Sequence, residues 1–335
     1  MRKINWGLIG FGNVVKNNIN GFPFDSENSE LYAFFQRNMK EGIKNKKKYN
    51  IPKFYSNVND LLSDENIDAI YICTPPGNHL EYAKLCCDFN KPTYIEKPFA
   101  RNYLEAIEIV EYFNSKNVPI WVAHYKRTLP KFLKIRELLQ KDIIGKIVNI
   151  NFNSERQYNS LLNNHKWLFN IELSGGGRFF DIAPHFVDLL VFYFGKLKKV
   201  YGLSSNNCNK YKTEDIVTFI FETESGIIGS ANYNFLSNKR LDLFTISGTK
   251  GAMSFSLEGG GDIKLNILGK EYVITFDEPY IYEKDMVDSI GKELLTKKYN
   301  SNICHGKDAL ETYNVIDLVL SDFYNGRNKD FWKNQ

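Results

Sequence analysis

Near the N-terminus, residues 4–15 read INWGLIGFGNVV. An apolar run ends at Gly10, which suits the tight turn after a first strand, and Gly12 lets the backbone approach a pyrophosphate closely. A helix that opens just after this turn directs amide groups and a partial positive charge at the same phosphates. We therefore expect a dinucleotide cofactor to contact Gly10, Phe11, Gly12, Asn13 and Val14.

Val15 keeps a second interpretation open. It occupies the third position of the glycine fingerprint, where glycine is usual, and a lone GxG pair is also typical of a plain tight turn. The position of the pair directly after an N-terminal strand favours the cofactor interpretation.

Strand and helix patterns alternate over residues 1–123. We expect strands at 5–9, 31–35, 69–73, 93–95 and 120–123, and helices at 14–20, 58–62, 79–89 and 103–114. Strands that are apolar throughout and alternate with helices predict a parallel sheet covered on both faces. The first domain is therefore expected to be an α/β Rossmann domain, a doubly wound parallel sheet.

The pattern changes in the second part of the chain. Strands are expected at 147–152, 217–221, 227–233, 241–246 and 272–276, with glycine-containing turns between several of them and helices at 183–194, 283–295 and 308–323. This predicts an α+β domain over 124–335 with a large, mainly antiparallel open sheet. Its C-terminal helices are expected to pack back on the first domain.

Composition excludes several classes of protein. The net charge is only +4 over 335 residues, and we interpret the one dense basic run, 44–48, as a solvated helix end or loop. No apolar run is long enough for a membrane span. Five cysteines without a CxxC pair indicate reduced thiols and a cytoplasmic protein, and the five histidines show no metal-binding spacing. We expect no nucleic-acid partner, no membrane anchor and no catalytic metal.

The end of the second strand bears on cofactor choice. NAD-binding domains usually place a carboxylate there, to contact the ribose, but this segment reads AFFQR and ends at Arg37. A guanidinium group can bind a 2′-phosphate with two parallel hydrogen bonds. Arg37 therefore favours NADP over NAD, and an ordinary surface arginine is the alternative interpretation.

Two further motifs follow apolar strands, at the sheet edge where ligands bind in this architecture. The first is the segment TPPGNH, from which we expect cofactor contacts by Thr74, Pro75, Pro76 and His79. The second is Glu96-Lys97-Pro98. A partly desolvated lysine at that edge has a lowered pKa and can act as an acid-base group, and Pro98 restricts the backbone of Lys97. Plain turns are the alternative for both motifs.

The segment SGGGRFFDIAPH, residues 174–185, carries the second set of candidate catalytic groups. Three glycines allow close approach to a ligand or to another strand. Asp181 and His185 lie four residues apart, so they share a face of a helix, and a carboxylate beside an imidazole fixes its tautomer. Because proline suits only the first helical turn, Pro184 predicts that Asp181 caps this helix.

These four motifs, GxG, TPPxxH, EKP and GGGxxxDxxxH, occur here in one order and spacing. From Trp6 to at least Phe255, the chain resembles the Gfo/Idh/MocA family of glucose-fructose oxidoreductase, inositol dehydrogenase and their relatives. The resemblance implies a Rossmann domain and an α/β domain whose open sheet joins subunits, hence a homodimer or homotetramer. It also implies that Lys97 contacts the nicotinamide ribose and substrate, and that Asp181 and His185 act as the acid-base pair. From its position beside Lys97, Glu96 is expected to contact the cofactor or to stabilise the ammonium group.

The predicted function is hydride transfer between NAD(P) and a carbinol or carbonyl group of a sugar, polyol or related small molecule. Lys97, Asp181 and His185 are the expected catalytic residues. The expected substrate-binding residues are His124, Tyr125, Arg127, Trp167 and Arg178. Two alternatives remain: a non-catalytic regulatory protein that binds a dinucleotide, and a lyase or hydrolase that uses bound NAD as a transient redox relay.

Overall fold

The computed structural model describes residues 2–12, 15, 26–158 and 166–334. Its chain divides into two compact units. Unit 1 contains residues 1–100, 105–128 and 280–309, and unit 2 contains 101–104, 129–279 and 310–335. Each unit has its own sheet. Among the described residues, every helix is too short or too polar to cross a membrane.

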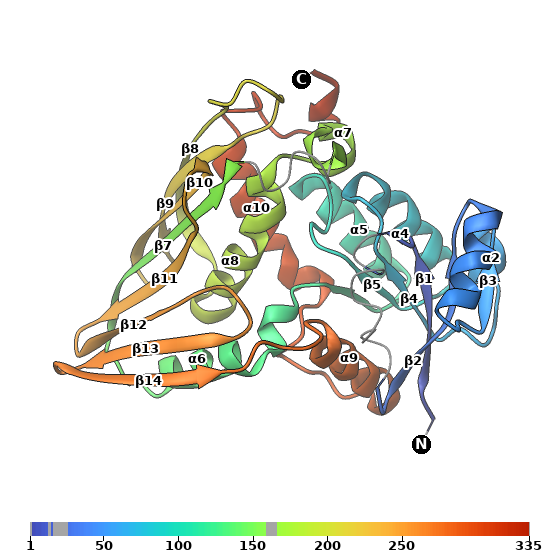
Figure 1. Ribbon diagram of the computed structural model, residues 1–335, viewed down its shortest axis with the longest axis horizontal. Coiled ribbons are helices and arrows are strands. Elements are labelled where there is room, and N and C mark those ends of the chain that lie inside the picture. Colours follow the sequence, from blue (N-terminus) through green and yellow to red (C-terminus); the bar gives the residue numbers. More distant parts are fainter. Residues whose placement is uncertain (1, 13–14, 16–25, 159–165, 335) are drawn as a thin grey trace. The chain divides into compact units, whose positions relative to one another are not determined.

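The sheet of unit 1 is parallel and has six strands in the order β3-β2-β1-β4-β5-β6 (Figure 1). The strands are β1 Ile4–Ile9, β2 Ser29–Phe35, β3 Lys53–Tyr55, β4 Ala69–Ile72, β5 Thr93–Ile95 and β6 Ile120–Val122. The order turns back beside β1, as in a doubly wound sheet, and confirms the predicted Rossmann fold. The carboxyl ends of β1 and β4 are neighbours, which creates the crevice where ligands bind in this fold.

The helices of unit 1 follow the strands. They are α2 Met39–Lys48, α3 Val58–Leu62, the 3₁₀ turn η2 Pro76–Asn78, α4 His79–Asp88, α5 Tyr103–Ser115, η3 Tyr125–Thr128 and α9 Lys284–Thr296. The first two residues of α5, Tyr103 and Leu104, belong to unit 2. The basic run 44–48 forms the exposed C-terminal end of α2, as expected. Most of the helix predicted at 14–20 lies outside the described residues.

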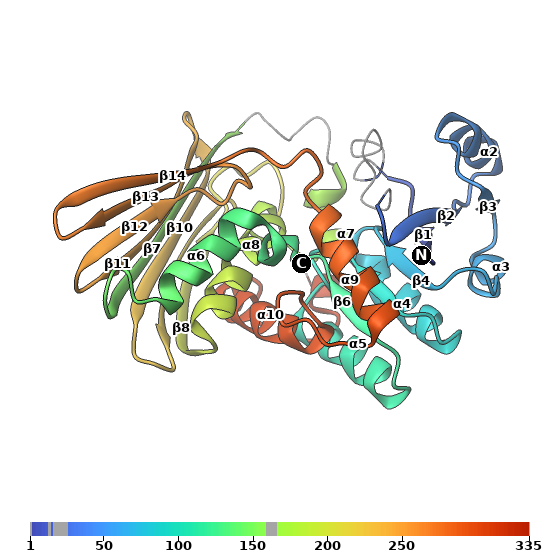
Figure 2. The same cartoon turned by 90° about the horizontal axis from the view of Figure 1, so that it is seen from below.

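Unit 2 is built on an eight-stranded sheet in the order β14-β13-β12-β11-β7-β10-β9-β8 (Figure 2). The strands are β7 Ile147–Gln157, β8 Leu197–Ser205, β9 Ile216–Thr223, β10 Ile228–Ser237, β11 Leu241–Gly248, β12 Gly251–Phe255, β13 Gly261–Ile267 and β14 Lys270–Phe276. All neighbouring pairs are antiparallel except β7 with β10. This confirms the predicted large, mainly antiparallel sheet.

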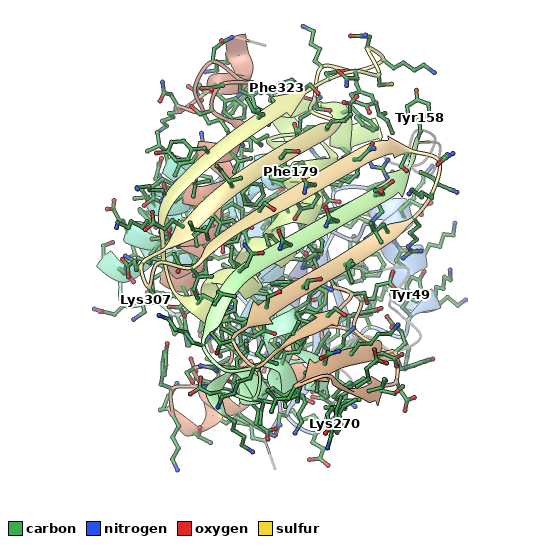
Figure 3. The ribbon with its side chains drawn as sticks, turned by 90° about the vertical axis from the view of Figure 1, so that its left-hand side faces the viewer. Tyr49, Tyr158, Phe179, Lys270, Lys307 and Phe323 are labelled. Atoms are coloured by element: carbon green, nitrogen blue, oxygen red, sulfur yellow. The ribbon has the colours of Figure 1, made fainter. Side chains whose placement is uncertain are left out.

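Helices cover one face of this sheet. They are α6 Pro130–Gln140, α8 Arg178–Phe194 and α10 Gly306–Leu320. The shorter helices η5 Lys166–Phe169, α7 Ile171–Ser174 and η6 Phe331–Asn334 complete the described helices of unit 2. Phe186 of α8 stacks on Phe152 of β7 with ring centroids 4.6 Å apart. No helix among the described residues covers the opposite face, and Figure 3 looks directly onto its strands. The sheet is therefore open on one side, as the alternation of apolar and polar residues in several strands predicts.

Helix α8 differs from the prediction. It begins at Arg178, with Gly177 as N-cap, and not near residue 183. Pro184 therefore lies inside the helix, and the prediction that Asp181 caps it is wrong: Asp181 is already helical. The reason lies far away in the sequence. The carboxylate of Glu214 accepts the backbone N–H of Gly177 at 2.8 Å and that of Phe180 at 3.1 Å, and so stabilises an earlier helix start.

Candidate active site

A pocket of about 390 Å³ lies at the carboxyl ends of β1, β2 and β4 in unit 1. Six predicted cofactor residues line it: Gly10, Phe11, Gly12, Arg37, Thr74 and Pro75. Gln36, Asn38, Asn78 and Tyr82 also line it and were not predicted. Asn13 and Val14 lie outside the described residues. Segments distant in sequence thus converge where the Rossmann fold places a dinucleotide.

The two glycines of the first turn have different physical roles. Gly10 has a φ of +101°, and a Cβ there would lie 2.9 Å from Cγ2 of Thr74, so this position excludes a side chain. A Cβ at Gly12 would meet no atom within 4 Å. Gly12 therefore leaves open space on the pocket side, and this space fits the approach of a pyrophosphate to the backbone.

Polar residues after β2 form the far side of the pocket. Gln36 Oε1 accepts a hydrogen bond from Asn45 Nδ2 at 2.9 Å, and Asn38 Oδ1 accepts the N–H of Glu41 at 3.1 Å, which caps α2. Arg37 is exposed beside them. Among the described residues that line the pocket, none carries a carboxylate. The lining therefore offers a cation at the ribose end.

His79 does not lie where we expected. It is 0% exposed, and its ring nitrogens lie 3.1 Å from the carbonyl oxygen of Phe99 and 2.7 Å from that of Thr74. Burial lowers the pKa of His79 to about 4, although these carbonyls favour the charged form. The prediction of direct cofactor contact by His79 is wrong, because its ring is enclosed. It ties the loop after β4 to the loop after β5.

Lys97 stands just after β5, at the same edge of the sheet. It is half-buried, and its backbone N–H donates to Oε2 of the neighbouring Glu96 at 2.9 Å. Glu96 is only 7% exposed, and its other oxygen accepts a hydrogen bond from the hydroxyl of Tyr71 in β4. Neither Glu96, Lys97 nor Pro76 lines the 390 Å³ pocket. The carboxylate of Glu96 thus faces the protein and anchors the loop that carries Lys97.

Three predicted substrate residues follow β6 in unit 1. His124 lies two residues after the end of the strand, and Tyr125 packs edge-on against Tyr282 at 5.8 Å between ring centroids. Arg127 is 4% exposed. Burial would raise the pKa of Asp308, but the hydrogen bond from His305 and, next in size, the charge of Arg127 lower it. The guanidinium of Arg127 therefore already has a counter-charge inside unit 1.

The glycine run in unit 2 admits backbone from the same unit. A Cβ at Gly175 would lie 2.7 Å from Cα of Arg101, and a Cβ at Gly177 would lie 2.7 Å from the carbonyl oxygen of Glu214. Of the two explanations for this run, a ligand or a neighbouring segment, the structure supports the second. The run fixes the N-terminus of α8, and with it Asp181 and His185, which share one face of that helix.

The remaining predicted residues of unit 2 differ in their surroundings. Arg178 is 4% exposed, donates from Nη1 to the carbonyl oxygens of Gln157 and Phe235 at 3.3 and 3.4 Å, and lies over the Phe235 ring. Burial lowers its pKa. Trp167 lies in η5 and is half-buried. The guanidinium of Arg178, which the sequence analysis assigned to substrate binding, therefore forms hydrogen bonds within unit 2.

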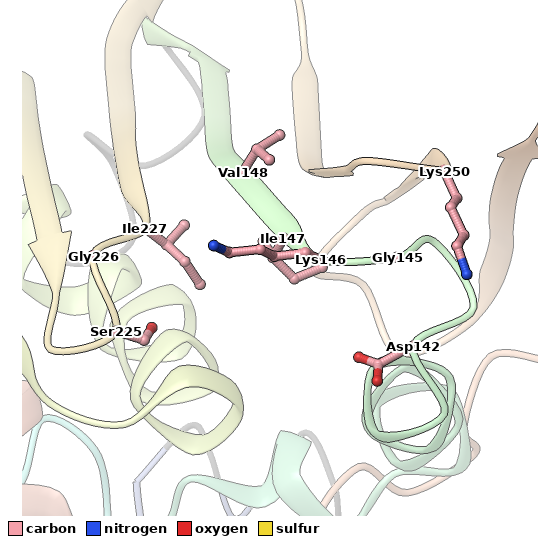
Figure 4. Close-up of a pocket in the computed structure, with 9 residues that line it drawn as sticks. All are labelled: Asp142, Gly145, Lys146, Ile147, Val148, Ser225, Gly226, Ile227 and Lys250. Atoms are coloured by element: carbon pink, nitrogen blue, oxygen red, sulfur yellow. The ribbon is translucent and has the colours of Figure 1, made fainter.

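A second hollow, of about 710 Å³, lies at one end of the sheet of unit 2 (Figure 4). Its lining includes Lys146, Lys250 and Asp142 from the loops, beside Ile147 and Ile227. None of the predicted site residues belongs to it. The hollow in unit 1 is therefore the one that matches the motifs.

Comparison with known proteins agrees with this geometry. Residues 4–124 match the family model described as oxidoreductase family, NAD-binding Rossmann fold, and residues 132–254 match the GFO/IDH/MocA C-terminal domain. Oxidoreductase P35 of Formosa agariphila is 33% identical over 94% of this chain and 98% of its own. The chain belongs to the Gfo/Idh/MocA family. It is an NAD-binding oxidoreductase of that family.

More distant Gfo/Idh/MocA relatives extend the likeness. Trans-1,2-dihydrobenzene-1,2-diol dehydrogenase of Mus musculus is 24% identical over 85% of this chain and 87% of its own. Among solved structures, levoglucosan dehydrogenase in complex with NADH and levoglucosan has a TM-score of 0.83 at 18% identity, and covers 97% of this chain and 98% of its own. The aldose-aldose oxidoreductase of Caulobacter crescentus has a TM-score of 0.86, also at 18% identity, with the same coverage. At these identities the structural matches support the fold.

Two buried residues were missed by sequence reasoning although they contact the predicted ones. Tyr71 lies inside an apolar strand, where its hydroxyl gives no signal. Glu283 precedes α9, and its oxygen Oε2 lies 2.9 Å from the same hydroxyl. Only the fold of unit 1, which includes residues 280–309, brings it to Glu96. Glu283 lies so far from Tyr71 and Glu96 in the sequence that no motif spacing links these residues.

Proposed function

We propose that this protein catalyses reversible hydride transfer between a nicotinamide cofactor and a carbinol carbon of a sugar, polyol or related diol. The observation that supports it most directly is the pocket of unit 1, where Gly12 leaves room for a pyrophosphate. The proposed substrate class is taken from relatives whose names refer to 1,2-dihydrobenzene-1,2-diol, levoglucosan and aldose. A bound nicotinamide ring would take up or release the hydride.

Three side chains supply the proton chemistry in this proposal. In the oxidation direction, His185 takes the proton of the substrate hydroxyl, and Asp181 fixes the tautomer of its imidazole and stabilises the imidazolium. Lys97 donates a hydrogen bond to the same oxygen and stabilises its developing negative charge. In this scheme His185 accepts the proton, while Asp181 and Lys97 orient and stabilise the charged groups. The alcohol carbon gives up its hydride to the cofactor.

The central test is turnover with and without Lys97. The parent protein is screened for absorbance change at the nicotinamide band with aldoses, inositols, keto-sugars and nucleotide sugars. With the best substrate, Lys97→Ala should lower kcat by about 10²-fold or more, as expected for a lost acid-base group, while cofactor binding stays measurable. Lys116→Ala, which removes a surface lysine of unit 1, should leave kcat unchanged.

Other outcomes of this screen contradict the proposal. Near-full turnover of Lys97→Ala would remove Lys97 from the mechanism. Tight cofactor binding without any turnover would favour a regulatory protein. Conversion of a substrate without net consumption of the cofactor would favour a lyase or hydrolase in which NAD acts as a transient relay.

For the cofactor we propose a preference for NADP over NAD. Support comes from the exposed guanidinium of Arg37 and from the lack of a carboxylate among the described pocket residues. We predict tighter binding of NADPH than NADH, and Arg37→Ala should narrow the ratio of the two dissociation constants by about tenfold, the worth of one charged hydrogen-bonding partner. Calorimetric titration measures both constants. Equal constants in the parent protein would dismiss the role of Arg37.

We also propose that the protein forms a homodimer or homotetramer through the open face of the sheet in unit 2. Exposed apolar side chains gather on β8 to β10, with Tyr201 65%, Leu203 77%, Ile220 52% and Ile228 61% exposed. Tyr201 pairs with Ile220 across the strands. An apolar patch on a flat, uncovered sheet is a typical subunit interface.

The five free thiols fit a reducing, cytoplasmic environment.

A further inference from the structure

Two carboxyl groups meet in the interior of unit 1. Glu96 follows β5, and Glu283 is the residue that precedes α9. Their exposed fractions are only 7% and 6%. Carboxylates are rarely buried to this extent without a cation or several donors around them, because loss of hydration disfavours their charge. The surroundings of this pair therefore decide how many protons it holds.

One phenol joins the two acids. The hydroxyl of Tyr71 is hydrogen-bonded to Oε1 of Glu96 and lies 2.9 Å from Oε2 of Glu283. The second oxygen of Glu96 accepts the backbone N–H of Lys97 at 2.9 Å. A phenol has a single proton, so it can donate to only one of two carboxylates at a time. The second carboxyl group needs a proton of its own to complete the cluster.

Electrostatics point to Glu283 as the group that carries this proton. Burial first, and the charge of Glu96 second, raise the pKa of Glu283 well above its ordinary value. The positive charge of Lys97 acts on Glu283 in the opposite direction but does not reverse the shift. Two like charges that share a buried site cannot both remain ionised.

Burial favours the neutral form of the phenol and thiol groups around the cluster. Tyr94 of β5 stacks on Tyr71 with centroids 4.9 Å apart, and Cys73 directly follows β4. Burial, with the charges of Glu96 and Glu283, raises the pKa of Tyr71, Tyr94 and Cys73 well above their ordinary values. The charge balance of the cluster therefore rests on Glu96, Glu283 and Lys97.

We propose that Glu96 and Glu283 form a proton-sharing carboxyl pair with a single negative charge, and that this charge sets the protonation of Lys97. Glu283 is then a positioning residue that acts through Lys97 and holds the Glu96 carboxylate in place with Tyr71. The link to turnover rests on the proposed role of Lys97. The pair itself can be tested without turnover, so its failure and that of the proposed function are distinguishable.

A proton-sharing pair has a characteristic response to amide substitutions. In Glu283→Gln the remaining carboxyl, Glu96, carries the single charge. In Glu96→Gln the charge of Glu96, the second cause of the raised pKa of Glu283, is removed, and the proposal requires Glu283 to ionise in its place against the effect of burial. Either single variant therefore keeps one negative charge near Lys97, whereas the double variant has none. Only the double variant should lower the pKa of Lys97, by about one unit or more, as expected for loss of a nearby opposite charge.

The titration is read by NMR on full-length protein labelled with ¹³C at the lysine ε carbon, whose shift reports protonation. The signal of Lys97 is the one missing from Lys97→Arg. Glu111→Gln, which changes an exposed carboxylate of α5, is the matched control and should leave the Lys97 titration unchanged. The expected result is near-identical titration in the parent and both single variants, and a clear downward shift in Glu96→Gln/Glu283→Gln.

Two patterns would overturn the proposal. If each single variant lowers the pKa of Lys97 and the effects add, both carboxylates are ionised in the parent. If Glu96→Gln alone produces the whole shift, Glu283 does not take over the charge.

A second measurement keeps the proposal falsifiable if the double variant does not fold. Infrared difference spectra of the folded parent at neutral pH, against each single variant, should show the carbonyl band of one neutral carboxylic acid. The same band should be lost in both Glu283→Gln and Glu96→Gln, because the remaining acid of each is ionised. A parent without this band contradicts the shared proton.

Discussion

His305 lies in the part of unit 1 contributed by residues 280–309 and is held between two acids. Its Nε2 lies 2.9 Å from Oε1 of Glu293, its Nδ1 lies 3.4 Å from Oδ2 of Asp308, and its ring stacks on Tyr299 at 4.4 Å between centroids. Burial alone would lower the pKa of His305, but the hydrogen bonds to Asp308 and Glu293 outweigh it and raise the pKa to about 9.

This shift predicts a pH-dependent stability. A histidine whose pKa is raised in the folded state stabilises the fold fully below its ordinary pKa of 6.5, and this contribution is lost as the pH rises through about 9. We expect unit 1 to lose on the order of 2 kcal/mol between those values, measured by urea unfolding. His305→Asn should lack this loss. An equal pH dependence in both proteins would contradict the assignment to His305.

At the residue scale, the sequence predicted groups that share a local motif. Gly10, Gly12, Thr74 and Pro75 line one pocket because each follows a strand whose carboxyl end lies at one edge of the sheet. His305 was not predicted, because the spacing of its partners, with Glu293 before it and Asp308 three residues after it, matches no recognised motif. His79 was assigned to the cofactor because a motif gives the position of a side chain in sequence but not whether its ring is enclosed.

The start of helix α8 shows how one distant residue can determine an element. Glu214 is 0% exposed, and its carboxylate accepts the N–H groups of Gly177 and Phe180 and the hydroxyl of Tyr324, the last at 2.5 Å. An interior proline costs a helix roughly 3 kcal/mol, and the two hydrogen bonds from Gly177 and Phe180 to this carboxylate at the helix N-terminus offset part of that cost.

Removal of this cap should therefore be costly. We predict that Glu214→Ala destabilises unit 2 by about 2–4 kcal/mol, because two buried N–H groups lose their acceptor. Glu224→Ala, an exposed carboxylate between β9 and β10, is the matched control and should change the unfolding free energy by less than about 0.5 kcal/mol. Both values come from chemical denaturation. A Glu214→Ala protein as stable as its control would show that solvent or another group replaces the carboxylate.

At the element scale, the predicted strands and helices share a clear apolar period. The three-residue β3 and helices α2 and α6 were not predicted. Nor were β8, β12 and β13: β8 and β12 are rich in lysine, serine or glycine and alternate only weakly, whereas the alternation of Ile263, Leu265 and Ile267 in β13 was overlooked. Their neighbours in the sheet supply the hydrogen bonds that local sequence does not demand.

Considered as whole units, the two sheets followed from the sequence more directly than the division of the chain. A change from buried parallel strands to half-buried antiparallel strands separates them near residue 124. The chain nevertheless contributes residues 280–309 to unit 1 and residues 101–104 to unit 2. The prediction of C-terminal helices on the first domain anticipated α9, which packs against β1 and β2.

The open face of the sheet in unit 2 makes a prediction about assembly. Leu203→Arg places a charge in the exposed apolar group on β8, so it should convert the oligomer to monomers in analytical ultracentrifugation. Leu268→Arg changes a leucine that is equally exposed but lies in the turn between β13 and β14, and should leave the assembly intact. A parent protein that sediments as a monomer would refute the proposed interface.

The discontinuity of unit 1 has a consequence for synthesis. During translation, the six parallel strands leave the ribosome before Glu283, α9 and His305 have been made. Until the whole sheet of unit 2 has been translated, Tyr71 and Glu96 of the nascent Rossmann sheet lack their third partner, Glu283. The nucleotide-binding unit therefore completes its fold late in synthesis, although most of its residues are translated first.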